Sequence, residues 1–264
     1  MKNLNSKTVW ITGASDGIGK ALAIQLADEG ARIILTARST DKLKAVQSEL
    51  KGDNHIVFPM DLMKTDAIPE AVQSILSQVG RIDILINNAG ISQRSLVKDT
   101  DVSVDRCIME LDYFAVVYLT KSLLPHLQER QTGCIVTISS VAGKLGTPMR
   151  SAYCAAKHAV IGFMDSLRAE VFSDGIEVLV VTPGSIKTNI SKNALEGDGK
   201  NHGVTDPAIE NGIDVDVCAK KIIKGIKNDS QELLIAKGVE RLATYIKRFF
   251  PKMLFKMVRS IKST

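Results

Sequence analysis

Short apolar runs alternate with longer stretches of helical periodicity from residue 8 to residue 235 of the chain. The short runs are rich in β-branched residues, which is typical of strands. We expect strands at residues 8–11, 32–37, 55–58, 83–87, 133–140, 177–181 and 232–235. Strands that alternate with helices at such intervals form βαβ units, so the strands are parallel and helices cover both faces of the sheet. The sequence therefore predicts a doubly wound α/β fold with seven strands in one sheet.

A glycine-rich turn follows the first expected strand. Gly13, Gly17 and Gly19 form a Gly-x-x-x-Gly-x-Gly pattern, and helical periodicity then continues to Gly30. Glycines let the backbone approach a pyrophosphate closely, and the free amides and dipole at the start of a helix favour an anion. Glycine clusters also occur in ordinary tight turns. The position between the first strand and the first helix favours nucleotide binding.

The second expected strand ends at a basic residue. About twenty residues beyond the glycine turn, folds that bind NAD place an acid that accepts hydrogen bonds from the adenosine 2′-hydroxyl. This chain has Ala37 and Arg38 there. A guanidinium suits a 2′-phosphate, although an exposed arginine at the end of a strand needs no ligand. Arg38 therefore favours NADP(H) over NAD(H).

Tyr153 and Lys157 lie four residues apart in a stretch with helical periodicity. Both side chains then share one face of the helix, one turn apart. An ammonium close to a phenol lowers the pKa of the phenol from its ordinary value of about 10, so the tyrosine can donate and accept a proton. The same spacing occurs on many solvated helices, so the pair predicts catalysis only together with other motifs.

Five motifs occur in the order and at the intervals of one enzyme superfamily. They are Thr12-Gly13-x-x-x-Gly17-Ile18-Gly19, Asn87-Asn88-Ala89-Gly90, Ser140, Tyr153-x-x-x-Lys157 and Pro183-Gly184. Over residues 5–236 the chain resembles the classical short-chain dehydrogenase/reductase superfamily. The resemblance implies a Rossmann-type sheet in a domain of residues 1–236, with a nicotinamide cofactor lying across the strand ends.

The resemblance also implies which residues hold NADP(H). Those at the pyrophosphate would be Gly13, Ser15, Asp16, Ile18 and Gly19. Around the rest of the cofactor, the resemblance implies Arg38 and Ser39 at the 2′-phosphate, Asp61 and Leu62 at the adenine, Asn88, Ala89 and Gly90 at the adenosine side and the central strand, and Pro183, Gly184, Ile186 and Thr188 at the nicotinamide.

By the same resemblance, three residues would carry the reaction. Tyr153 would protonate a carbonyl oxygen as hydride arrives, or remove the proton in the oxidative direction. Ser140 would hydrogen-bond to that oxygen and orient it. Lys157 would hold the nicotinamide ribose and keep Tyr153 acidic. The irregular residues 185–213 would form a lid over the substrate.

One residue in the long helix expected at residues 103–129 departs from the family pattern. The family usually has an asparagine that completes a proton relay through water to the lysine, and the matching residue here is Asp112. Its backbone carbonyl can still hold that water. Its charge would stabilise the Lys157 ammonium and change the pKa of Tyr153, with a sign that the sequence does not give. An inactive relative is the alternative interpretation.

Residues 237–264 form a basic extension beyond the family pattern. The extension has eight Lys and Arg and one acid, Glu240, so it carries a net charge of +7 against −2 for the rest of the chain. Pro251 should divide it into two short helices, with the proline in the first turn of the second. The apolar stripe of these helices comprises Tyr245, Ile246, Phe249, Phe250, Met253, Leu254, Met257, Val258 and Ile261. Such a segment can lie on an anionic membrane surface, or it can cover the substrate pocket or a partner subunit.

Composition indicates the class and the location of the protein. Its 264 residues, 45% of them hydrophobic, suffice for the core of one large domain. No apolar stretch reaches the roughly 18 residues of a membrane span and no leader pattern opens the chain, so we expect a cytoplasmic protein, with peripheral membrane contact through the extension as an alternative. The four cysteines form no Cys-x-x-Cys motif and no group with histidine, which argues against disulfides and against a metal site.

The function expected is that of an NADP(H)-dependent oxidoreductase. It would transfer hydride between the nicotinamide and the carbonyl or secondary alcohol of a lipophilic substrate, and the resemblance implies a homodimer or homotetramer. A 3-oxoacyl reductase of fatty-acid synthesis is one alternative, although such enzymes usually lack the extension. A non-catalytic NADP-binding module is another, favoured only by Asp112. No base-reading or stacking motif accompanies the positive charge, so we expect no nucleic-acid partner.

Overall fold

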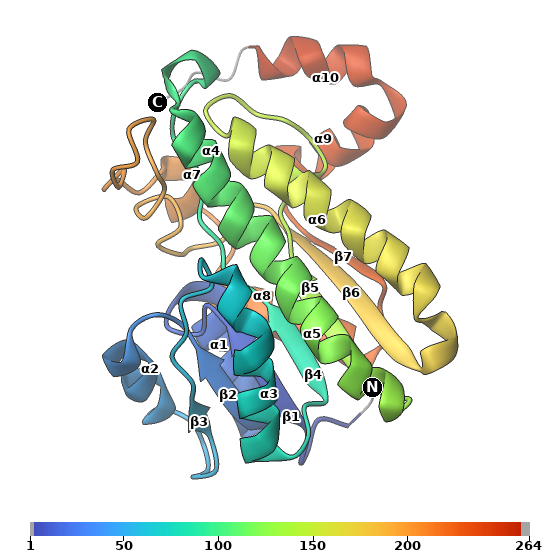
Figure 1. The fold of residues 1–264 in the computed structure, drawn as a ribbon. Coiled ribbons are helices and arrows are strands. Elements are labelled where there is room, and N and C mark those ends of the chain that lie inside the picture. Colours follow the sequence, from blue (N-terminus) through green and yellow to red (C-terminus); the bar gives the residue numbers. More distant parts are fainter. Residues whose placement is uncertain (1–2, 260–264) are drawn as a thin grey trace.

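The structure is a computed structural model that describes residues 3–259. In these residues seven parallel strands form one sheet in the order β3-β2-β1-β4-β5-β6-β7 (Figure 1), which confirms the predicted fold class. The strands are β1 (Thr8–Thr12), β2 (Arg32–Thr36), β3 (Ile56–Val57), β4 (Ile84–Asn87), β5 (Gly133–Ile138), β6 (Ile176–Pro183) and β7 (Glu232–Ile235). The order reverses between β1 and β4, and ligands of such sheets bind at the carboxyl ends of the strands near this point.

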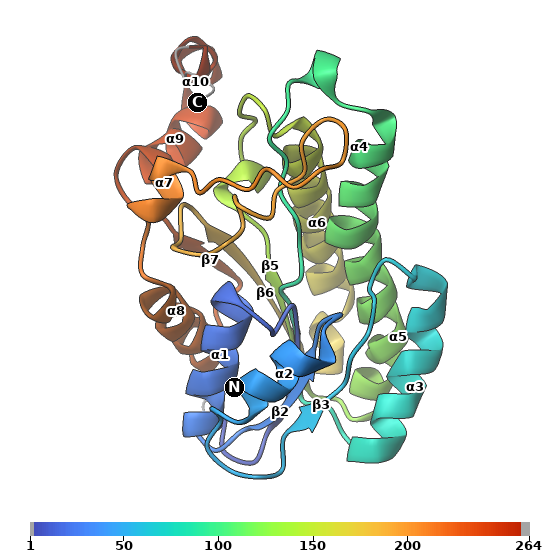
Figure 2. The same cartoon turned by 90° about the vertical axis from the view of Figure 1, so that its left-hand side faces the viewer.

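Helices cover both faces of the sheet (Figure 2). One layer contains α1 (Gly17–Asp28), α2 (Thr40–Gln47) and α8 (Val215–Lys227), and the other contains α3 (Ile68–Val79), α4 (Val102–Met109), α5 (Ala115–Glu129) and α6 (Ser151–Glu170). Because successive side chains of a strand point to opposite faces, Val9 and Ile11 enter the core under α1 and α8, whereas Trp10 enters the core under α3 and α5. The two cores explain why the strands read as continuous apolar runs.

The helix expected at residues 103–129 is interrupted by one turn of different geometry. A π-helical turn, Glu110–Phe114, joins α4 to α5, and the backbone N–H of Ala115 donates to the carbonyl of Glu110 five residues earlier. Helical periodicity does not reveal this turn, because the apolar residues on either side continue the same pattern. Asp112 lies in the turn and is completely buried. Turns of this kind occur frequently at functional sites.

The basic extension forms two helices over the carboxyl edge of the sheet, here called the hood. They are α9 (Gly238–Phe249) and α10 (Pro251–Val258), with Pro251 in the first turn of α10 as predicted. Ala243, Ile246 and Leu254 of the hood pack on Val141 and Leu145, which follow β5. The hood therefore covers the pocket side of the sheet, and Ile261 of the predicted stripe lies outside the described residues. Between the hood and α4, the segment from β6 to α8 crosses the top of the sheet and includes the short helix α7 (Pro207–Glu210) (Figure 2).

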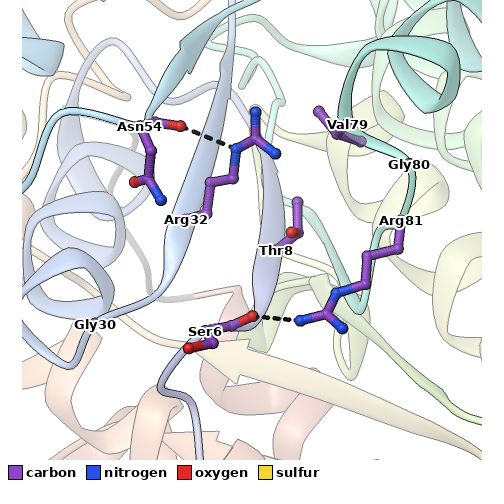
Figure 3. Close-up of a pocket in the computed structure, with 8 residues that line it drawn as sticks. All are labelled: Ser6, Thr8, Gly30, Arg32, Asn54, Val79, Gly80 and Arg81. Atoms are coloured by element: carbon purple, nitrogen blue, oxygen red, sulfur yellow. Dashed lines mark hydrogen bonds between the residues drawn. The ribbon is translucent and has the colours of Figure 1, made fainter.

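A separate cavity of about 400 Å³ lies at the amino edge of the sheet (Figure 3). Arg32 and Arg81 line it, and each donates to a backbone carbonyl, Arg32 to Asn54 at 3.0 Å and Arg81 to Ser6 at 2.7 Å. This cavity contains none of the residues that the sequence predicts for cofactor binding or catalysis. Among the described residues, no helix is both long and apolar enough to span a membrane.

Candidate functional site

A cavity of about 1080 Å³ opens at the carboxyl edge of the sheet, beneath the hood. It brings together eighteen of the predicted residues, namely Gly13, Ser15, Asp16, Ile18, Arg38, Ser39, Asp61, Leu62, Asn88, Ala89, Gly90, Ser140, Tyr153, Lys157, Pro183, Gly184, Ile186 and Thr188. The two other predicted residues, Gly19 and Asp112, are not among the residues that line it. Segments that are far apart in the sequence thus meet at the edge where the topology places a ligand.

The glycine turn leaves backbone open to this cavity. Gly13 and Gly17 have φ angles of +63° and +53°, a conformation that favours glycine. The Asp16 carboxylate accepts a hydrogen bond of 2.7 Å from the Gly17 amide and caps α1. Gly19 is closely packed, because a Cβ atom there would lie 2.3 Å from the Gly13 carbonyl oxygen.

Asn88 joins the glycine turn to the middle of the sheet. Its side-chain amide donates to the carbonyls of Thr12 at 2.9 Å and Gly13 at 3.2 Å, so the end of β4 holds the end of β1. The Thr12 hydroxyl in turn accepts from the amides of Asn88 and Ala89. Asn88 therefore fixes the shape of the turn that would receive a pyrophosphate.

Cations line the far end of the cavity, beyond β2. Arg38 and Lys42 both line it, and the Ser39 hydroxyl accepts from the Lys42 amide at 3.4 Å as the cap of α2. Sequence reasoning missed Lys42, although its position in the first turn of the helix after Arg38 was a usable signal. The open glycine turn, the paired cations and the volume of the cavity fit a phosphorylated dinucleotide.

Tyr153 and Lys157 lie side by side on α6 at the other end of the cavity. Lys157 Nζ is 5.7 Å from the centre of the Tyr153 ring, and it donates to the Ile138 carbonyl at 3.1 Å. Both side chains are almost completely buried. Ser140 lies opposite, and its hydroxyl donates to the Pro183 carbonyl at 3.4 Å and accepts from the Ala142 amide at 3.1 Å. The geometry thus gathers a phenol, an ammonium and a hydroxyl around one point of the cavity wall.

Asp112 lies behind Lys157. Its Oδ1 accepts from the Ile91 amide at 2.8 Å, and its Oδ2 is 3.1 Å from Lys157 Nζ. Burial favours the neutral form of Lys157, but the charges of Asp112 and Tyr153 outweigh it and raise the pKa of the ammonium. Burial likewise raises the pKa of Asp112, while Lys157 acts to lower it. The two groups form a buried ion pair in which Lys157 stays charged.

The pKa of Tyr153 is raised, contrary to the expectation from the Tyr–Lys pair alone. Burial is the largest cause, and the charge of Asp112 adds to it. Lys157, the hydrogen bond with Ser140 and the charge of Arg150 act in the lowering direction. Asp112 therefore counteracts Lys157, which gives the sign that the sequence left open.

Three charged residues that the sequence does not predict as site residues join the segment from β6 to α8 to the cavity wall. Asp206, in the segment from β6 to α8, accepts from Arg94 Nε at 2.9 Å and from Arg150 Nη2 at 3.0 Å. Arg94 is almost completely buried. The pairing joins residues more than fifty positions apart, so no local sequence pattern predicts it. Hood residues Ala243, Leu254, Met257 and Val258 also line the cavity. Leu254, Met257 and Val258 belong to the predicted apolar stripe, whereas Ala243 was not predicted.

Comparisons with known proteins agree with this geometry. The family described as short chain dehydrogenase matches residues 7–199. The chain is 41% identical to the "Dehydrogenase/reductase SDR family member 7B" of Xenopus laevis, over 97% of this chain and 81% of that protein. A short-chain dehydrogenase from Streptomyces avermitilis superposes with a TM-score of 0.81 at 28% identity, covering 97% of this chain and 98% of the other. A metagenomic short-chain oxidoreductase in complex with NADP superposes with a TM-score of 0.72 at 28% identity, covering 89% and 99%.

We expect the substitution Asp112→Asn to lower the pKa of Tyr153, because it removes the nearby negative charge. Asparagine can still accept the hydrogen bond from the Ile91 amide. The measurement is the ultraviolet titration of tyrosinate, with Tyr153→Phe to identify the signal of Tyr153. The control Asp165→Asn removes an exposed acid of α6 that pairs with Arg168 and should leave this pKa unchanged. An unchanged or higher pKa in Asp112→Asn would show that Asp112 carries no charge in the native protein.

Proposed function

Because the chain belongs to the short-chain dehydrogenase family, we propose that it is an NADP(H)-dependent oxidoreductase of lipophilic ketones and secondary alcohols. The observation that carries the proposal is the meeting of Ser140, Tyr153 and Lys157 at one end of a cavity whose other end holds Arg38. A reductase needs a proton donor at the substrate and a cofactor site that extends away from it. This cavity offers both.

In the proposed mechanism, the side chains around Tyr153 handle the proton. Reduced nicotinamide, when bound, supplies a hydride to the carbonyl carbon. The Ser140 hydroxyl donates a hydrogen bond to the carbonyl oxygen and orients it. Tyr153 gives its proton to that oxygen, and the phenolate that remains is stabilised by the Lys157 ammonium. In the oxidative direction the phenolate accepts the proton of the alcohol, so the raised pKa of Tyr153 shifts oxidation toward higher pH.

The choice of NADP(H) rests on the cations after β2. Arg38 and Lys42 line the cavity there, and no acid stands at the end of β2, where NAD-binding folds place one. The metagenomic relative that binds NADP supports the same choice.

The lipophilic substrate and a membrane contact are proposed from the hood. Its inner residues Ala243, Leu254 and Met257 give the cavity an apolar wall. Its outer side keeps large apolar residues exposed, among them Phe249 at 68% and Phe250 at 65%. Seven Lys and Arg lie in residues 237–259 with Glu240 as the only acid. Exposed aromatic residues among cations suit an anionic lipid surface, from which a lipophilic substrate could reach the cavity.

We expect the protein to oxidise NADPH in the presence of ketones, measured across aliphatic, acyl, sphingoid-like and steroid ketones in detergent. Tyr153→Phe should reduce kcat at least about a hundredfold, because it removes the proton donor. Tyr118→Phe, which alters a tyrosine of α5 outside the cavity, is the matched control and should keep its activity. Tight NADPH binding without turnover of any ketone would instead favour the non-catalytic NADP-binding module.

Arg38→Ala should lower the preference for NADPH over NADH by about ten- to a hundredfold, since charge-assisted hydrogen bonds to the 2′-phosphate are lost. The dissociation constants of both cofactors are measured by fluorescence titration. Arg32→Ala removes an arginine from the opposite end of the same strand and should leave the preference unchanged. A preference that survives in Arg38→Ala would contradict the role proposed for Arg38.

Replacing Phe249 and Phe250 by serine should weaken binding to vesicles that contain anionic lipid by about tenfold or more, because less apolar surface enters the interface. Co-sedimentation with phosphatidylserine-containing vesicles measures the effect, and purely zwitterionic vesicles should bind the wild type weakly. Phe172→Ser is the control, since this residue is also exposed but lies after α6, away from the hood. Equal binding of the double variant and the wild type would argue against the membrane contact.

A further inference from the structure

The single acid of the basic extension points back toward the sheet. Glu240 lies in the first turn of α9, where the helix dipole favours a negative charge. Its carboxylate accepts a hydrogen bond of 2.5 Å from the Ser185 hydroxyl. It also accepts from the Ser185 amide, at 3.0 Å to Oε2 and 3.2 Å to Oε1. The Glu240 carboxylate thus accepts hydrogen bonds from both the hydroxyl and the backbone amide of Ser185.

Ser185 lies where three segments meet. It follows Pro183 and Gly184 at the end of β6, and the Gly184 amide donates to the Ile235 carbonyl of β7 at 2.9 Å. The Ser185 carbonyl accepts from the Ile213 amide at 2.8 Å, at the end of the segment that crosses the cavity. A change in the conformation of Ser185 would therefore affect the edge of the sheet, the segment from β6 to α8 and the hood.

Gly184 is needed for the approach of Glu240. A Cβ atom at residue 184 would lie 2.1 Å from Glu240 Oε2 and 3.1 Å from Ala236 Cβ. Any other residue at 184 would push the carboxylate away from Ser185. The contact between Glu240 and the end of β6 therefore depends on glycine at residue 184.

The same hood touches the segment that carries Ser140. Ala243 and Ile246 of α9 pack on Val141 and Leu145, of which Val141 directly follows Ser140. Glu240 is one helical turn before Ala243, so the polar contact to Ser185 and the apolar contact to Val141 lie on neighbouring turns of α9. The hood therefore contacts the ends of both β5 and β6, which border the end of the cavity that contains Ser140 and Tyr153.

We propose that Glu240 is a positioning residue that locks the hood onto residues 183–188 and holds this segment in the shape that receives the nicotinamide end of the cofactor. The proposal rests on the proposed function for the role of residues 183–188. It predicts that seating of the hood and binding of the cofactor support each other, because both depend on the same conformation of Ser185.

Amide hydrogen exchange of the protein without cofactor tests the lock directly. Glu240→Ala should speed exchange of the Ser185 amide by about tenfold or more, because the amide loses its charged acceptor. Glu240→Gln keeps an acceptor oxygen and should restore most of the protection. Glu232→Ala removes a different carboxylate, an exposed partner of Lys144 at the start of β7, and should change nothing. Unchanged exchange at Ser185 in Glu240→Ala would overturn the proposal.

Cofactor affinity provides the second measurement. NADPH should bind Glu240→Ala about tenfold more weakly, with KM for NADPH rising more than kcat falls, whereas Glu240→Gln stays close to the wild type. Equal affinity in Glu240→Ala and the wild type would overturn the coupling between hood and cofactor. If the wild type itself binds no NADPH, the proposed function fails, and the exchange measurement still decides whether Glu240 locks the hood.

Discussion

A lysine ammonium buried beneath the carboxyl edge of the sheet imposes the strongest constraint on this site. Lys157 gives up most of its water, and the Ile138 carbonyl and the Asp112 carboxylate replace it. A buried charge without such partners would cost several kcal/mol. Asp112, which lies outside α6, brings its Oδ2 within 3.1 Å of Lys157 Nζ. The structure achieves this through the π-helical turn that holds Asp112 inward between α4 and α5.

The ion pair also restricts its neighbours. A Cβ atom at Gly90 would lie 3.0 Å from Asp112 Oδ2 and 3.2 Å from Lys157 Nζ, so the small residue after β4 leaves room for the pair. Both charges act on Tyr153: the Lys157 ammonium favours the phenolate, and the Asp112 carboxylate opposes it. With the family's usual asparagine at residue 112, only the favourable effect of the Lys157 charge would remain. This chain therefore stabilises its lysine more firmly, at the expense of the acidity of its tyrosine.

Local sequence patterns predict the elements of this fold well, because strand and helix periodicities depend on residues close together in the chain. The same holds for the glycine turn and for Pro251, which begins α10 as expected. Local sequence patterns do not predict contacts between residues that lie far apart in the chain. Asp206 bonds to Arg94 and Arg150, and Glu240 bonds to Ser185. These partners are more than fifty residues apart in the sequence, so helix and strand periodicity does not predict their contacts. The π-helical turn at Asp112 was missed because one added residue per turn leaves the apolar pattern almost intact.

In the proposed function, the extension covers the pocket and also contacts a membrane surface, and these two roles are compatible. A helix pair has two sides, and only the side with Ala243, Ile246 and Leu254 is buried against the domain. The sequence nevertheless supplies further large apolar residues, and Phe249, Phe250 and Met253 remain more than half exposed. A segment that served only as a cover would gain solubility from polar residues at these positions. In the proposed function, the hood is held on the domain through the side that carries Glu240. Its opposite side, with apolar surface among cations, would bind the lipid surface.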